Sequence, residues 1–258
     1  MGKVYSVDIH RFVRSGVCSQ FAYLISLVFL MATPLIGQVR DYSEKEFNQV
    51  KGFFDRSYGS DYSLLNGRQY YLLYSSVSHP FIFSDQYRGE SLRLNGVSYE
   101  GIPINYDIYK QHIVLQYTGY SGQLQQLILN QELIGDFSIA GKLFRRLIFP
   151  DTGARFYQVV SEGEVSCYLF WEKTMYYAPE ENATPYNYTQ PSRHLYILRS
   201  GQLHSIKTRN AFVNLFEEGY RKEINRFYRR EKVSFKNGTD TSIRQLIEFC
   251  NNLLDTGE

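Results

Sequence analysis

The residues best suited to proton transfer or metal binding in this sequence are its histidines. Beyond residue 37 there are four of them: His79, His112, His194 and His204. A zinc site needs three or four converging ligands, and none of the familiar short His or Cys spacings is present. A two-residue turn at Ser200-Gly201 would set His204 opposite Ile197 and leave His194 on the other face of the hairpin. The sequence therefore predicts neither a metal site nor a cofactor.

Acid–base catalysis has equally little support. His79 and Asp85 flank an aromatic segment and could act as a base and the group that orients it, but such pairs are common by chance. Asp107 falls on the polar face of an expected strand, where we predict a solvated or edge carboxylate. We therefore assign no catalytic residue.

Four basic side chains form the clearest charged feature. Lys222, Arg226, Arg229 and Arg230 fall on one side of a predicted helix, opposite its apolar residues. They could contact anionic lipid head groups or an acidic partner, or they could be the solvated face of an amphipathic helix. Interleaved acids such as Glu223, and a total of 28 Lys+Arg against 26 Asp+Glu, argue against a nucleic-acid partner.

Residues 1–37 have the layout of a secretory signal peptide. Lys3, Arg11 and Arg14 precede an uncharged apolar stretch, which a proline interrupts near its end. The stretch is slightly shorter than the about 20 residues of a transmembrane helix. We expect export and cleavage at the end of this segment, with an uncleaved N-terminal anchor as the alternative. Cleavage removes three basic residues and one acid, so the formal net charge falls from +2 to zero.

Two cysteines, Cys167 and Cys250, follow the signal segment, and both fall on predicted apolar faces. A disulfide would persist in an oxidising compartment. The two residues are therefore either buried free thiols or a bridge that fastens the C-terminal helix to the sheet, and their separation decides between these alternatives.

Hydrophobic periodicity predicts one α+β domain over residues 38–258. The capping pattern at residues 43–46, followed by apolar residues at helical spacing, predicts a short helix ending near Asp55. Residues 68–207 alternate apolar and polar side chains between Gly-containing turns, which predicts antiparallel strands. Helical spacing returns over residues 208–258 and predicts three helices. We expect a twisted antiparallel sheet, either open or curled into a roll or partial barrel, closed by the terminal helices.

Turn dipeptides assign side chains to the inner face of this sheet. Asn95-Gly96 predicts a two-residue hairpin loop that pairs Leu92 with Tyr99. The same reasoning applied to Glu162-Gly163 places Val160 and Trp171 on one face. The residues that could line an apolar-ligand site in a half-open barrel are therefore Leu92, Tyr99, Val160 and Trp171.

Several stretches of the sequence are familiar in combination. They are Leu65-Asn66-Gly67-Arg68, His79-Pro80-Phe81, Leu94 to Tyr99 followed by Tyr106-Asp107-Ile108-Tyr109, and the ending from Leu195 through Phe249. Together they resemble uncharacterised exported proteins of the Bacteroidota. The shared motifs are strand, turn and helix patterns, so the resemblance implies no activity and no site. It implies an envelope location, periplasmic or at the cell surface, in a Gram-negative bacterium.

Three function hypotheses follow from these observations. The first is a non-enzymatic envelope protein, a binding or assembly factor that contacts another envelope protein. The second is a carrier or sensor of an apolar, lipid-like ligand in a half-open barrel. The third is a hydrolase that uses His79 or Asp107.

Overall fold

The computed structural model describes residues 67–72, 78–118, 122–179 and 185–256, all of which belong to one compact unit, residues 46–258. The expected signal segment at residues 1–37 and the expected helix at residues 43–55 lie outside the described residues.

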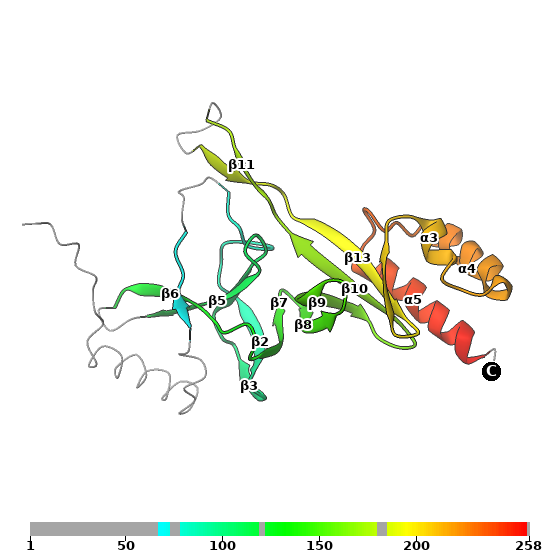
Figure 1. The fold of residues 1–258 in the computed structure, drawn as a ribbon, viewed down its shortest axis with the longest axis horizontal. Coiled ribbons are helices and arrows are strands. Elements are labelled where there is room, and N and C mark those ends of the chain that lie inside the picture. The colour runs from blue at the N-terminus through cyan, green and yellow to red at the C-terminus, as the bar shows by residue number, and fades with distance from the viewer. Residues whose placement is uncertain (1–66, 73–77, 119–121, 180–184, 257–258) are drawn as a thin grey trace, which may run out of the picture. The chain divides into compact units, whose positions relative to one another are not determined.

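The described chain forms antiparallel sheets followed by helices (Figure 1). The largest sheet has the strand order β14-β13-β10-β9-β8-β7-β2-β3. Its strands are β2 (Gly89–Leu94), β3 (Val97–Glu100), β7 (Ile134–Ile139), β8 (Lys142–Phe149), β9 (Gly153–Ser161), β10 (Val165–Glu172), β13 (Ser192–Arg199) and β14 (Gln202–Ile206).

Two smaller sheets accompany it. The four-stranded sheet has the order β1-β6-β5-β4, with β1 (Arg68–Gln69), β4 (Ile104–Asp107), β5 (His112–Thr118) and β6 (Leu124–Ile128). The third sheet pairs β11 (Met175–Tyr177) with β12 (Tyr186–Tyr188). The prediction of an antiparallel sheet is thus confirmed. None of these sheets closes on itself, so the expectation of a roll or partial barrel is not confirmed.

Three helices follow the last strand: α3 (Arg209–Val213), α4 (Glu218–Arg230) and α5 (Asp240–Asp255). The hydroxyl groups of Thr208 and Thr239 cap α3 and α5 by accepting hydrogen bonds from backbone N–H groups of the first turn. The predicted C-terminal helical segment is confirmed. Among the described helices, none combines the length and apolar character that a membrane crossing requires.

The two largest of four hydrophobic clusters among the described residues hold these layers together. The first joins the four-stranded sheet to the β2–β9 half of the large sheet, with Tyr106 edge-on to Phe137, Phe144 and Phe156. The second lies between β10 and β13 and the three helices. β10 is buried along most of its length because helices cover one face and aromatic side chains of neighbouring strands cover the other.

Two predicted hairpins have the expected register. Leu92 lies opposite Tyr99 across the Asn95-Gly96 turn. Ile197 lies opposite His204 across the Ser200-Gly201 turn. Both turns place two consecutive residues at positive φ, which is the geometry that a two-residue hairpin loop requires.

The register predicted at Glu162-Gly163 is wrong. The pairing of β9 with β10 begins at Ser161 opposite Cys167, so the loop is longer than two residues. The side chain of Asn251 in α5 contacts β10 directly after this loop. Its Oδ1 accepts a hydrogen bond from the Val165 N–H at 2.8 Å, and its Nδ2 donates to the Val165 carbonyl at 3.0 Å. A helix side chain thus binds the backbone of the first residue of β10.

Candidate functional site

A cleft opens in the large sheet where β9 and β10 separate. The last paired residues of the two strands are Gln158 and Leu169. β9 starts earlier, at Gly153, and β10 continues to Glu172, so these ends of the strands do not pair with each other. Beyond this point β10 contacts the turn between β4 and β5 instead. The Lys173 N–H donates to the Ile108 carbonyl at 3.3 Å. A change of partner along β10 therefore creates the cleft.

Asp107 shapes the turn that replaces β9 as the partner of β10. Its Oδ1 accepts hydrogen bonds from the backbone N–H groups of Tyr109 and Lys110, each at 2.9 Å. Its Oδ2 accepts one from the Tyr70 hydroxyl at 2.8 Å. An aspartate that binds the N–H groups two and three residues ahead is a turn-forming arrangement. Lys110 and His112 are thereby held at one side of the cleft.

Gln111 connects this turn to β10. Its Nε2 donates to the carbonyl of Trp171 at 3.0 Å and to that of Ile108 at 2.7 Å, while its Oε1 accepts a hydrogen bond from the Tyr106 hydroxyl. Gln111 has a φ of 60°, a conformation that few residues other than glycine adopt. The Gln111 side chain thus donates a hydrogen bond to a carbonyl of β10 in the part of that strand that no longer pairs with β9.

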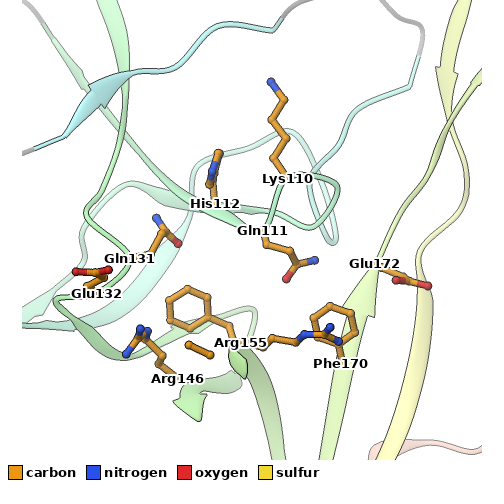
Figure 2. Close-up of a pocket in the computed structure, with 11 residues that line it drawn as sticks. Lys110, Gln111, His112, Gln131, Glu132, Arg146, Arg155, Phe170 and Glu172 are labelled. Atoms are coloured by element: carbon orange, nitrogen blue, oxygen red, sulfur yellow. The ribbon is translucent and has the colours of Figure 1, made fainter. Parts of the chain in front are cut away.

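We call this opening the interstrand cleft. It has a volume of about 540 Å³, within the range of small-ligand sites. Figure 2 shows the residues of the β4–β5 turn on one side, with Arg146 and Arg155 across from them. The lining residues are Lys110, Gln111, His112, Gln131, Glu132, Arg146, Ala154, Arg155, Phe156, Phe170 and Glu172.

The cleft holds cations that have no carboxylate partner. Lys110, Arg146 and Arg155 form no ion pair with any described residue, whereas Glu172 accepts a hydrogen bond from Nε2 of His194 at 2.8 Å. The guanidinium carbon of Arg155 lies 4.9 Å from the centre of the Phe170 ring, and Figure 2 shows this stacking. Stacking holds the guanidinium plane in place and leaves its N–H donors directed outward.

His112 adds a neutral imidazole to this wall. Burial lowers its pKa below the ordinary value of 6.5, and the charges of Arg68 and Lys110 lower it further against the opposing effect of Asp107. At neutral pH the side chain is therefore uncharged. Lys110, Arg146 and Arg155 bring three formal positive charges to the lining, and Glu132 and Glu172 bring two negative charges.

The prediction of a solvated Asp107 is wrong. The residue is fully buried, and burial raises the pKa of its carboxyl group, although the hydrogen bonds from Lys110, Tyr70 and Tyr109 act in the opposite direction. β4 is an edge strand, in agreement with the prediction of an edge carboxylate. Tyr70 and the β4–β5 turn nevertheless cover that carboxylate. Asp107 is a positioning residue that does not line the cleft.

His79 and Asp85 do not form the base and orienter considered above. Their side chains share no hydrogen bond, and Nδ1 of His79 is buried without a partner among the described residues. The His79 carbonyl accepts a hydrogen bond from Nζ of Lys173 at 2.7 Å. Neither residue lines the cleft.

The four residues expected to line an apolar-ligand site lie in core clusters. Leu92 and Tyr99 belong to the first hydrophobic core, Val160 belongs to the second, and Trp171 packs against both. The Trp171 indole N–H donates to Oε1 of Gln158 at 2.8 Å. None of the four lines the interstrand cleft.

The predicted basic stripe lies on α4 as expected. Lys222, Arg226, Arg229 and Arg230 are all exposed. Arg230 donates to Glu231 at 2.7 Å and lies 5.1 Å from the centre of the Phe227 ring. The other three form no ion pair with a described residue.

The two cysteines are buried free thiols. Both belong to the second core, and burial raises both pKa values, that of Cys250 to about 12. The alternative of a disulfide between α5 and the sheet is not formed in this structure.

Sequence reasoning missed Gln111, Arg146 and Arg155. Arg146 and Arg155 lie on neighbouring strands, where the register sets Arg146 opposite Phe156 and Arg155 opposite Leu147. The two arginines stand on either side of the turn between β8 and β9, and this spacing could have indicated that they lie near each other. No comparable pattern indicated the contact of their strands with the β4–β5 turn, because that contact joins segments distant in the sequence.

Comparison of the chain with protein-family models, with curated proteins and with solved structures found no match.

Proposed function

We propose that this protein is an exported, non-enzymatic binding protein that recognises an acidic group of another cell-envelope component in the interstrand cleft. The observation that carries the proposal is that three basic residues, Lys110, Arg146 and Arg155, line the cleft and have no ion-pair partner among the described residues. The Lys110 ammonium lies 5.8 Å from the centre of the Tyr70 ring. Export and the envelope location rest on the sequence of residues 1–37 and on the resemblance described above.

The geometry favours binding over catalysis. Two of the side chains near the cleft that could transfer a proton have structural roles, since Asp107 is buried in its turn and Glu172 is bonded to His194. His112 and Glu132 also line the cleft, but among the described residues they share no hydrogen bond that would pair a base with an orienting group. Two guanidinium groups and an ammonium group instead provide fixed donors for an anion.

Equilibrium binding of labelled anionic oligomers tests the proposal. The purified protein is titrated into fluorescein-labelled oligoglutamate, oligoglucuronate and oligolysine, and binding is followed by fluorescence anisotropy. We expect at least one acidic probe to bind and oligolysine not to bind. The double variant Arg146→Gln/Arg155→Gln should weaken binding by at least about tenfold, because charge-assisted hydrogen bonds are lost.

The matched control is Arg88→Gln, which removes the same charge at an exposed residue outside the cleft. It should bind the acidic probe like the wild type. Equal binding by the double variant and the wild type, or no binding of any acidic probe, would contradict the proposal.

The exposed stripe on α4 favours a second contact, with anionic lipid. Lys222, Arg226 and Arg229 lack ion-pair partners among the described residues, and each cation near a charged membrane surface contributes about 1 kcal/mol. The variant with all three changed to Gln should lose flotation with vesicles containing phosphatidylglycerol. A variant with Arg88, Lys207 and Lys232 changed to Gln has the same charge and should retain it. Equal loss of flotation in both variants would mean that vesicle binding depends on the net charge of the protein, which would contradict a specific contact through α4.

A further inference from the structure

We infer that the acidic group belongs to an extended peptide segment, which adds as a strand to the open edge of β9 in the interstrand cleft. This inference rests on the proposed function and names the chemical class of its ligand. It follows from the strand pairing and from which residues of β9 line the cleft.

The first portion of β9 has a strand partner on one side only. Gly153 to Phe156 pair with Phe149 to Arg146 of β8, but among the described strands none pairs with their other edge. Gly153 and Ala154 are exposed, and Arg155 is half-buried. An edge of this kind presents N–H and C=O groups that another strand can pair with.

This edge borders the cleft. Ala154, Arg155 and Phe156 all line it, although successive side chains of a strand point to opposite faces of the sheet. Three consecutive lining residues therefore mean that the cleft runs along the edge of β9 as well as over one face. A ligand in the cleft meets backbone groups in addition to side chains.

Charge selects which peptide would add there. Arg155 lies on β9 at the open edge, whereas Arg146 lies on β8, one strand farther in and on the opposite face of the sheet. Lys110 belongs to the turn on the other side of the cleft. Alternate side chains of an added strand would point to one face of the sheet, so an acidic residue on that strand could reach a guanidinium while its backbone pairs with β9. Backbone pairing favours a peptide over an acidic saccharide, because a saccharide has no repeating N–H and C=O groups to match the edge.

Backbone methylation of the peptide tests the inference. The probe is a capped hexapeptide of alternating Glu and Thr residues, made in three forms: unmodified, N-methylated at alternate residues along one edge, and N-methylated along both edges. All three carry the same charge. A strand that adds to β9 uses one of its own edges, so the peptide methylated along one edge should bind within about threefold of the unmodified form. The peptide methylated along both edges should bind at least about tenfold more weakly.

The remaining outcomes separate the two proposals. Equal binding of all three peptides would overturn the strand-addition inference while leaving acid recognition intact. Oligoglucuronate that binds as tightly as the unmodified peptide, or more tightly, would also overturn it. Binding by neither the peptides nor oligoglucuronate would overturn the proposed function as well. The Arg146→Gln/Arg155→Gln and Arg88→Gln variants are measured with the unmodified peptide, and only the double variant should bind more weakly.

Discussion

Asp107 organises the cleft without touching a ligand. Its carboxylate fixes the turn that carries Lys110, Gln111 and His112, and Gln111 then donates a hydrogen bond to the carbonyl of Trp171 in β10. The alternation of apolar residues around Asp107 correctly predicted a strand. It did not predict burial of the acid, because Tyr70 and the turn that cover it come from contacts that periodicity does not encode.

Replacing Asp107 by Ala should destabilise the protein by about 3 kcal/mol, because the Tyr70 hydroxyl and two backbone N–H groups lose their acceptor in a buried site. Urea unfolding followed by circular dichroism measures the change. Glu100→Ala removes an exposed carboxylate and should alter the free energy of unfolding by less than about 0.5 kcal/mol. Equal effects of the two substitutions would show that these hydrogen bonds contribute nothing.

The cysteines provide a second prediction at the residue scale. Cys167 and Cys250 should resist alkylation by iodoacetamide in the native protein at pH 8, because burial raises their pKa values and excludes the reagent. In urea without reductant both should be alkylated, as identified by mass spectrometry of the peptides. A peptide pair linked by a disulfide would contradict the free-thiol assignment.

At the scale of elements, turn chemistry predicted strand pairing where the turn itself sets the register. Asn95-Gly96 and Ser200-Gly201 did so, because two residues at positive φ leave little choice of partner. Glu162-Gly163 did not set the register, because the strands pair from Ser161 opposite Cys167 and leave a longer loop, next to which Asn251 of α5 binds the backbone of Val165.

The start of α5 is fastened to the sheet by Asp240. Its carboxylate accepts hydrogen bonds from Lys142, from Gln158 at 2.6 Å and from Arg193 at 3.2 Å. Burial alone would raise its pKa, but the hydrogen bonds from Lys142 and Gln158 and the charges of Lys142 and Arg193 outweigh burial and lower it below 3.8. The ionised form is therefore favoured in the folded state.

A lowered pKa gives the Asp240 interactions a defined pH dependence. Their contribution to stability is complete above the ordinary value of 3.8 and is lost as the pH falls through the lower pKa of the folded state. Asp240→Asn should therefore cost about 2 kcal/mol at pH 7, and the difference from the wild type should shrink below pH 3.8. Urea unfolding at pH 7, 5 and 3 measures it. Asp151→Asn, at an exposed turn, should show no such trend, and a penalty for Asp240→Asn that stays constant with pH would refute the assignment.

At the scale of the molecule, the cleft arises from the meeting of two sheets. β10 takes β9 as its partner at one end and the β4–β5 turn at the other, so the opening exists only once both sheets share a core. The residues that form the cleft can be found in the sequence, namely the turn-forming Asp107 and the arginines of the β8–β9 hairpin. No local pattern in the sequence predicts that the β4–β5 turn and the β8–β9 hairpin lie close together, because these segments are about 40 residues apart in the chain.

The central claim is that acidic ligands bind in the interstrand cleft. Amide chemical-shift changes in ¹H–¹⁵N NMR spectra, recorded as the Glu–Thr hexapeptide is added to the labelled protein, test it most directly. The account predicts saturable shifts at Lys110–His112, Arg146 and Ala154–Phe156, with α4 unaffected. Shifts confined to Lys222–Arg230 of α4, or none at any residue of the cleft, would contradict it.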